Sequence, residues 1–231
     1  MPRPAPPFHD LRAVLLDYGG TLDGDAQHWF DHFVSLYAEA RADVPYAALK
    51  DAFYAADAAL PRDPEIGTFG LERMVRTHVG IQLRELRIED PALGTRLADR
   101  FIADTRAAWD RNRPLLASLA RRFRLGVVSN SYGNMPALLA DAAFPPFAVI
   151  VDSAIAGIAK PDPGIYRLAA TELGLAPATV LHVGDSWERD VVAAHAVGMH
   201  TAWLARPDAV TPPEPPNVWR LDSLLDLGVL P

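Results

Sequence analysis

Short runs of apolar residues recur along this chain, and each is closed by polar or glycine residues. The first run, residues 13–16, is followed by Asp17 and by Gly19-Gly20. A run of this length bounded by turn-forming residues is typical of a strand buried on both faces, as in a parallel sheet. Four further runs share the pattern: residues 125–128, 148–151, 180–183 and 200–204. Segments of helical periodicity separate most of them, which predicts a doubly wound parallel α/β sheet.

Residues 24–112 differ from the rest of the chain because they contain no apolar strand run. They show amphipathic helical stretches separated by proline and glycine. We therefore predict two domains: an α/β core formed by residues 10–23 and 113–231, and an all-helical domain inserted at residues 24–112. The proline-rich residues 1–9 are expected to form a flexible tail.

Composition excludes several classes of function. The chain has 22 Lys and Arg against 29 Asp and Glu, a formal net charge of −7, which argues against binding to nucleic acid or to an anionic membrane surface. The absence of cysteine excludes disulfides, thiolate catalysis and cysteine-based zinc sites. We find no signal peptide and no run long enough to span a bilayer, so we expect a cytoplasmic protein, either a monomer or a homodimer.

Polar residues stand at the ends of three of the predicted strands. Asp17 and Ser129 follow two of the apolar runs directly, Asp185 follows a third after Gly184, and Lys160 lies in a loop just before a helix start. Each alone is typical of a helix cap or a turn, but the carboxyl ends of parallel strands meet at one edge of the sheet. Two carboxylates there suit Mg²⁺, and an ammonium suits a phosphoryl group, for which Asp17 could act as the nucleophile.

Four ordered segments around these residues resemble the motifs of the haloacid dehalogenase superfamily. They are residues 14–22 (VLLDYGGTL), 127–130 (VVSN), 157–163 (GIAKPDP) and 183–190 (VGDSWERD). The resemblance covers residues 11 to 227 and implies a Rossmann-like core. The helical insertion between the first two motifs resembles the C1-type cap domain of that superfamily.

The resemblance also implies a role for each matching residue. Asp17 would be the nucleophile, and three groups would hold Mg²⁺: the carboxylates of Asp17 and Asp185 and the backbone carbonyl of Gly19. The transferring group would be bound by four residues: Ser129, Asn130, Lys160 and Gly20. Asp190 would orient the metal site or Lys160. The implied activity is that of a phosphatase-like hydrolase acting on a small phosphorylated substrate through an aspartyl-phosphate.

Gly19 departs from the pattern of the superfamily, whose phosphatases carry a second aspartate at this position as general acid and base. That help is commonly worth about 10²–10⁴-fold in rate. Three residues nearby could replace it: Asp23, His28 and His32. Alternatively, a good leaving group such as an aryl or acyl phosphate would need less acid assistance.

Two further interpretations stay open because of Gly19. The reaction could be the hydrolysis of a carbon–phosphorus or carbon–halogen bond, although Lys50, the only lysine of the insertion, is expected on a helix surface. The chain could also be a catalytically impaired protein that binds Mg²⁺ and a phosphorylated ligand or partner. The sequence does not identify the substrate.

Overall fold

The computed structural model of the chain describes residues 8, 10–212, 215 and 218–231. The tail predicted at residues 1–9 lies outside this range except for Phe8, which is buried and packs its ring 4.9 Å from His200 and 5.9 Å from Trp219. Within the described ranges, no helix has the length and apolar character needed to cross a membrane.

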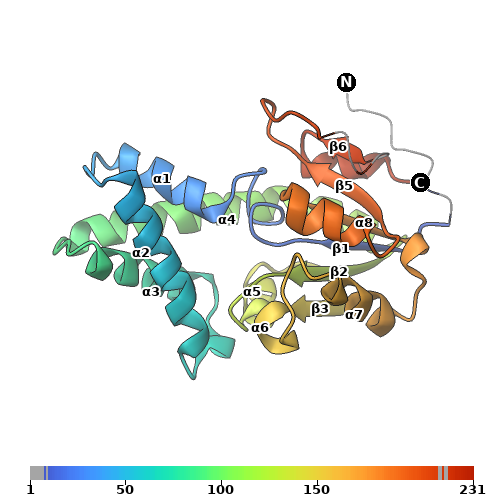
Figure 1. Cartoon of the computed structure of the whole chain (residues 1–231), viewed down its shortest axis with the longest axis horizontal. Helices are drawn as coiled ribbons and strands as arrows, with labels where there is room; N and C mark the ends of the chain where they lie inside the picture. The colour runs from blue at the N-terminus through green and yellow to red at the C-terminus, as the bar shows by residue number, and fades with distance from the viewer. Residues whose placement is uncertain (1–7, 9, 213–214, 216–217) are drawn as a thin grey trace.

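A six-stranded parallel sheet forms the centre of the core (Figure 1). The strands lie in the order β3-β2-β1-β4-β5-β6, and every neighbouring pair is parallel. Their bounds are β1 Ala13–Leu16, β2 Arg124–Ser129, β3 Val149–Asp152, β4 Val180–Gly184, β5 His200–Leu204 and β6 Trp219–Leu221. This order places β1 between β2 and β4 and confirms the predicted doubly wound fold.

Strand β1 is buried along its whole length because helices cover both faces of the sheet. Val14 and Leu16 pack in the cluster that includes residues of α4 and α5, whereas Ala13 and Leu15 pack in the cluster formed with α7 and α8. Alternate side chains of a strand point to opposite faces, so a short apolar run without polar interruptions fits this position. The helices are α4 Pro91–Leu119, α5 Met135–Asp141, α7 Gly164–Leu173 and α8 Ala193–His195.

Four helices on the left of Figure 1 form a layer beside the sheet. We call α1, α2, α3 and residues 91–112 of α4 the helical insert; the first three are α1 Trp29–Glu39, α2 Tyr46–Ala59 and α3 Leu71–Glu85. Aromatic rings hold these helices together: Phe33 of α1 stacks at 5.5 Å on His78 of α3 and at 4.8 Å on Phe101 of α4. Both phenylalanine rings belong to the same apolar cluster as Val14 and Leu16 of β1, so the insert and the core share a continuous interior.

Helix α4 is continuous across the predicted domain boundary between residues 112 and 113, although Pro114 lies inside it. A proline inside a helix costs about 3 kcal/mol. Here Leu116 and Leu119 beyond it are fully buried, and the Asn112 amide donates a hydrogen bond to the carbonyl of Leu22. Tertiary packing outweighs the local signal, and the predicted boundary at residues 112–113 lies within one helix.

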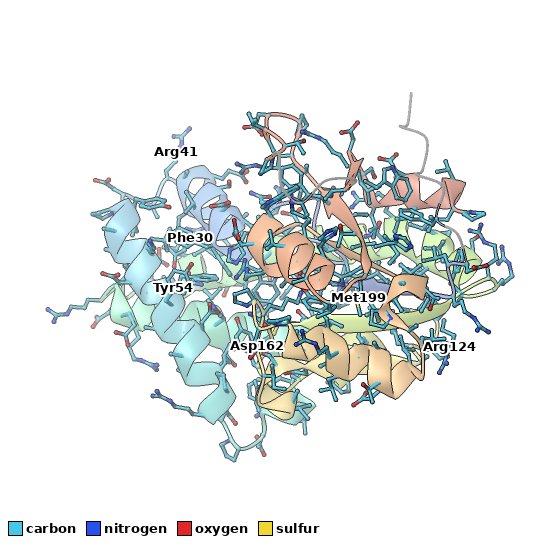
Figure 2. All side chains as sticks on the ribbon, turned by 45° about the vertical axis from the view of Figure 1, so that its right-hand side comes forward. Phe30, Arg41, Tyr54, Arg124, Asp162 and Met199 are labelled. Carbon is cyan, nitrogen blue, oxygen red and sulfur yellow. The ribbon has the colours of Figure 1, made fainter. Side chains whose placement is uncertain are left out.

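Shorter elements complete the chain. A π-helix, η4 Trp187–Val192, precedes α8 where the sequence predicted one regular helix over residues 189–197. The remaining elements are α6 Ser153–Ala156 and four 3₁₀ turns: η1 Leu60–Arg62, η2 Ile66–Thr68, η3 Pro177–Thr179 and η5 Leu224–Val229. Arg124, where β2 begins, lies at the end of the core away from the insert (Figure 2), so the carboxyl ends of the strands point toward the insert.

Candidate active site

The carboxyl ends of β1, β2 and β4 meet beside the helical insert, where a cavity of about 350 Å³ opens. Asp17 follows β1 and is anchored by its backbone N–H, which donates to the Val183 carbonyl at 2.8 Å. The cavity has two sides. The sheet-side wall includes Asp17, Gly19, Ser129, Lys160 and Asp190, and the insert-side wall includes His28, Trp29, Phe53, Tyr54, Asp57 and Met74.

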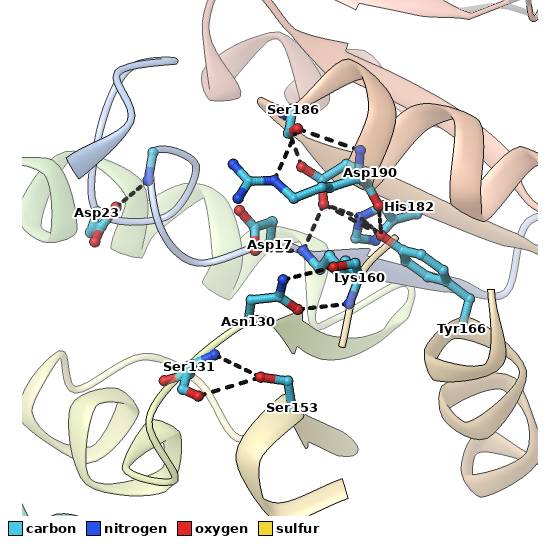
Figure 3. Close-up of polar contacts among 12 residues, drawn as sticks. Asp17, Asp23, Asn130, Ser131, Ser153, Lys160, Tyr166, His182, Ser186 and Asp190 are labelled. Atoms are coloured by element: carbon cyan, nitrogen blue, oxygen red, sulfur yellow. Dashed lines mark hydrogen bonds and ion pairs between the residues drawn. The ribbon is translucent and has the colours of Figure 1, made fainter. Parts of the chain in front are cut away.

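Lys160 is the centre of a buried ion-pair network on the sheet-side wall (Figure 3). Its Nζ donates to Oδ1 of Asp17 and to Oδ1 of Asp190, both at 2.6 Å, and its side chain is 3% exposed. Burial alone disfavours the ammonium, but the two carboxylates outweigh it and raise the pKa of Lys160 above its ordinary value. The lysine is therefore charged, and its position is fixed.

Asn130 holds the loop that carries Lys160. Its Oδ1 accepts the Lys160 backbone N–H at 2.8 Å, and its Nδ2 donates to the Lys160 carbonyl at 3.0 Å. Both polar atoms of the amide are engaged within the protein, although the sequence predicted a contact with the substrate. Ser129, one residue before it, has a buried hydroxyl facing the cavity, with no hydrogen-bond partner among the described residues.

Asp190 is the most heavily bonded carboxylate of the site. Besides Lys160, its Oδ1 is 3.2 Å from His182 Nε2 and 3.4 Å from the hydroxyl of Tyr166, and its Oδ2 accepts the Ser186 N–H at 3.0 Å. Burial opposes ionisation, but Lys160 and the hydrogen bond from His182 together lower the pKa of Asp190 below its ordinary value. Asp190 is thus an ionised anchor for Lys160.

Three acidic side chains, Asp17, Asp185 and Asp190, offer ligand atoms that all lie within 4.8 Å of one another. Burial, and then the repulsion between these carboxylates, raises the pKa of Asp185 well above its ordinary value. Burial also raises the pKa of Asp17, with Lys160 opposing it. No hydrogen bond from a described residue reaches the Asp185 side chain. A divalent cation would reduce the repulsion between the carboxylates and would give the Asp185 side chain a partner. The donor set fits a metal ion.

The two glycines after the nucleophile have different surroundings. Gly20 has φ +80°, and a Cβ built there would lie 2.5 Å from Oδ2 of Asp185, so only glycine fits beside this carboxylate. At Gly19 the nearest atom to such a Cβ is Nε1 of Trp29, at 3.8 Å. A side chain at Gly19 would therefore have space, and it would point toward the insert.

The structure separates the three predicted substitutes for a general acid. Asp23 is buried: its Oδ1 accepts the Gly20 N–H at 2.7 Å and its Oδ2 accepts the indole N–H of Trp29 at 2.6 Å. His32 lies 3.1 Å from Asp104 and stacks on Phe101. Of these three described residues, only His28 lines the cavity. Its Nδ1 accepts the Phe30 N–H at 3.2 Å, which leaves the ring proton on Nε2.

Asp57 on α2 brings a carboxylate into the cavity that sequence reasoning missed. Its Oδ1 accepts the hydroxyl of Tyr132 at 2.5 Å and lies 3.1 Å from His78 Nε2. Gln82 Nε2 is 2.7 Å from the other ring nitrogen of His78, which leaves the His78 proton on the atom facing Asp57. Tyr132 belongs to the core loop after β2, so this contact ties the insert to the core across the cavity.

The aromatic residues of α1 lie in two different environments. Trp29 lines the cavity, whereas Phe30, Phe33 and Tyr37 are buried in the interior. Figure 2 shows the rings of Phe30 and Tyr54 close together, and their centroids are 6.1 Å apart. An aromatic stretch in one helix does not reveal which ring faces the ligand.

Known proteins of similar sequence identify the family of this chain. The family model described as haloacid dehalogenase-like hydrolase matches residues 11–198. Haloacid dehalogenase-like hydrolase domain-containing protein 3 of Bos taurus is 37% identical over 93 residues, which are 40% of this chain and 37% of that protein. Phosphoserine phosphatase of Thermus thermophilus is 37% identical over 60 residues, 26% of this chain and 24% of that enzyme. The chain thus spans less than two thirds of the length of these relatives.

Solved structures cover more of the chain. The 2-haloacid dehalogenase of Pseudomonas syringae has a TM-score of 0.53 at 22% identity and covers 94% of this chain and 96% of its own. The HAD-hydrolase YfnB of Bacillus subtilis, bound to magnesium, has a TM-score of 0.55 at 21% identity and covers 95% and 97%. At these identities the similarity establishes the fold.

Proposed function

Since this chain belongs to the haloacid dehalogenase-like hydrolases, we propose that it is a Mg²⁺-dependent phosphatase that acts on a small phosphorylated compound through Asp17. The observation that carries this proposal is that the buried pair of Asp17 and Lys160 lines the cavity, while the half-buried Asp185 lies with Asp17 in one acidic cluster. A carboxylate nucleophile, a fixed ammonium and an acidic metal site are the groups that phosphoryl transfer requires. The similarity to named phosphatases over part of the chain supports the same activity.

The first step is attack on phosphorus by Asp17. Lys160 holds Oδ1 of this carboxylate at 2.6 Å, which leaves Oδ2 for the new O–P bond. As that bond forms, the ester P–O bond breaks and its electron pair goes to the leaving oxygen, which takes a proton from water. Bound Mg²⁺, held by Asp17, Asp185 and the carbonyl of Gly19, would neutralise phosphoryl charge.

The second step returns the enzyme to its starting state. Water attacks the phosphorus of the aspartyl-phosphate, loses a proton to solvent, and releases inorganic phosphate and the Asp17 carboxylate. The Ser129 hydroxyl, which faces the cavity without a protein partner, is placed to donate to a phosphoryl oxygen. Asp190 and Asn130 keep Lys160 in position throughout.

The alternatives left open by Gly19 receive less support. Lys50 is exposed on the surface of α2, where an amine stays hydrated, which does not suit a Schiff base for carbon–phosphorus cleavage. The dehalogenases among the structural neighbours share the fold, but the acid cluster of this chain favours metal-assisted phosphoryl transfer.

A broad screen of phosphorylated compounds with and without Mg²⁺ tests the proposal. We expect phosphate release that requires Mg²⁺ and that disappears in Asp17→Asn, a substitution that keeps the size of the side chain and removes its nucleophilic charge. Parallel assays of halide release from 2-haloacids distinguish the carbon–halogen alternative. Phosphate release no faster than in Asp17→Asn would contradict the proposal, and Mg²⁺-dependent ligand binding without turnover would establish the binding-protein alternative.

A further inference from the structure

Among the described residues that line the cavity, none is suited to protonate a leaving group beside the nucleophile. Gly19 has no side chain, and the atom nearest to a Cβ placed there is Nε1 of Trp29, at 3.8 Å, whose N–H is donated to Asp23. An indole N–H is a hydrogen-bond donor but not an acid at neutral pH. Asp23 itself is not among the described residues that line the cavity, because it lies behind this indole ring.

Other groups facing the cavity are unsuited to the task. The pKa of His28 is lowered, first by burial and then by Arg189, so its ring is neutral and offers only an N–H donor. Burial and the neighbouring Asp57 raise the pKa of Tyr132 well above its ordinary value. Asp57 accepts hydrogen bonds from Tyr132 and His78 at Oδ1, so this carboxyl is held on the insert side of the cavity.

The consequence for the substrate follows from leaving-group chemistry. A phenol has a pKa near 10, whereas an alkyl alcohol has a pKa close to that of water, about 16. A phenolate therefore leaves phosphorus without a proton from the enzyme, and it can be protonated by water afterwards. An alkoxide leaves slowly unless an acid assists it.

The insert-side wall independently favours an aromatic group. Trp29 and Tyr54 present rings on this wall, whereas Phe53 and Met74 border the cavity but are 1% and 0% exposed. The rings are fixed: Trp29 is edge-on to Phe101 at 4.8 Å, and Tyr54 is edge-on to Phe53 at 5.3 Å. Aromatic faces make favourable contacts with a planar ring, and a cavity of about 350 Å³ accommodates one aromatic ring with its phosphate.

We infer that the substrate is an aryl phosphate, whose phenolic oxygen leaves past Gly19 while its ring packs against Trp29 and Tyr54. This inference rests on the proposed phosphatase function and deepens it by naming the substrate class. Asp17 forms the O–P bond, the aryl P–O bond breaks with its electron pair on the phenolate oxygen, and water supplies the proton. Trp29 acts as part of the binding wall, and Asp23 is a positioning residue that holds the indole in place.

A comparison of phenyl phosphate with benzyl phosphate tests the inference on the unaltered protein. The two esters carry the same ring and the same phosphate, but a methylene in benzyl phosphate makes its leaving group an alkyl alcohol. With Mg²⁺ present, we expect kcat/KM to be at least about 10²-fold higher for phenyl phosphate. Equal or faster Asp17-dependent turnover of benzyl phosphate would overturn the inference and leave the phosphatase proposal standing. If neither ester, nor any compound of the wider screen, is turned over above Asp17→Asn, the phosphatase proposal itself fails.

The variants Gly19→Asp and Gly19→Asn identify the cause of the preference. Both add a side chain of the same size in a position with space for a Cβ, but only aspartate can donate and accept a proton. We expect Gly19→Asp to raise kcat/KM for benzyl phosphate and to reduce the phenyl-to-benzyl ratio at least 10-fold relative to Gly19→Asn. A ratio that is the same in both folded variants would show that the absent acid does not set the preference.

Discussion

The two walls of the cavity are built on different physical principles. On the sheet-side wall, charged groups make short and specific contacts, such as the two 2.6 Å bonds from Lys160 to Asp17 and Asp190. On the insert-side wall, rings pack against one another, and Asp57 is the carboxylate among the lining residues described there. The sheet-side wall fixes the positions of charged groups, and the insert-side wall fixes the shape of the cavity beside them.

This difference separates chemistry from recognition. Charged groups at strand ends are positioned by a sheet whose register leaves little freedom, so they suit a reaction that needs fixed electrostatics. The insert meets the core through a few contacts, among them Trp29 with Asp23 and Tyr132 with Asp57. Changes on the sheet-side wall should therefore affect turnover, and changes on the insert-side wall should affect substrate choice.

The largest expected effect comes from Lys160→Met, which removes the central charge of the sheet-side wall. Asp17 and Asp190 would remain buried without their shared partner, and breaking such a pair typically costs about 3–5 kcal/mol of stability. Loss of a fixed charge near the transferring group should also lower kcat by about 10²–10³-fold. Denaturant unfolding and steady-state kinetics measure the two effects. Lys50→Met is the control, because Lys50 is the only other lysine and is exposed. This substitution should leave stability and kcat nearly unchanged.

Asp23 should make stability depend on pH, because it joins the two walls as a buried carboxyl. Burial raises its pKa from 3.8 to about 7, with the hydrogen bonds from Trp29 and Gly20 opposing the shift. At a pH between 3.8 and about 7, Asp23 keeps its proton in the folded protein but has lost it in the unfolded chain, so stability falls as the pH rises through this range. The loss amounts to about 4 kcal/mol at most, at 1.36 kcal/mol per pKa unit.

Asp23→Asn isolates this contribution, since asparagine resembles the protonated carboxyl and does not titrate. Relative to this variant, the wild type should lose unfolding free energy steadily between pH 4 and pH 7, as measured by urea denaturation. Asp25→Asn is the matched control, because Asp25 forms an exposed ion pair with Arg111, and an exposed ion pair contributes little to the free energy of unfolding. If the wild type and Asp23→Asn depend on pH in the same way, the carboxyl is not held in its protonated form by burial.

Most of the sheet-side wall was predictable from the sequence. Asp17, Ser129 and Asp185 stand at the ends of apolar runs, and the end of a buried parallel strand is a place that the chain can specify locally. Even there, the partners within the network were not evident. His182 lies inside an apolar run, yet its Nε2 reaches Asp190, while its Nδ1 is buried without a partner among the described residues.

The insert-side wall was not predictable for a physical reason. Asp57 lies in the middle of an amphipathic helix, where a carboxylate usually faces water, and its pairing with Tyr132 depends on how the insert docks on the core. The domain boundary predicted between residues 112 and 113 falls inside α4, because burial of Leu116 and Leu119 favours a continuous helix. Local patterns do not encode contacts between segments that lie far apart in the sequence.

The adjacent glycines allow a finer test on the sheet-side wall. Gly20→Ala places a Cβ 2.5 Å from Asp185 Oδ2 at φ +80°, so we expect it to cost about 1–3 kcal/mol of stability and to weaken Mg²⁺ binding, measured by calorimetry. Gly19→Ala has an ordinary contact with Trp29 and a φ outside the left-handed region, so its stability should change by less than about 0.5 kcal/mol. Similar effects at both positions would show that the loop adjusts freely around Asp185.

The smallest expected effect concerns the contact between Asp57 and Tyr132, which crosses the cavity from insert to core. Asp57→Asn and Tyr132→Phe each weaken the same hydrogen bond, worth about 1 kcal/mol, so each should raise KM for phenyl phosphate several-fold and change kcat less. Because the two residues act through one bond, the double variant should resemble either single variant, whereas independent roles would give additive losses. Additive losses, or a loss confined to kcat, would mean that this carboxylate takes part in the chemistry and that recognition and reaction are not divided between the two walls.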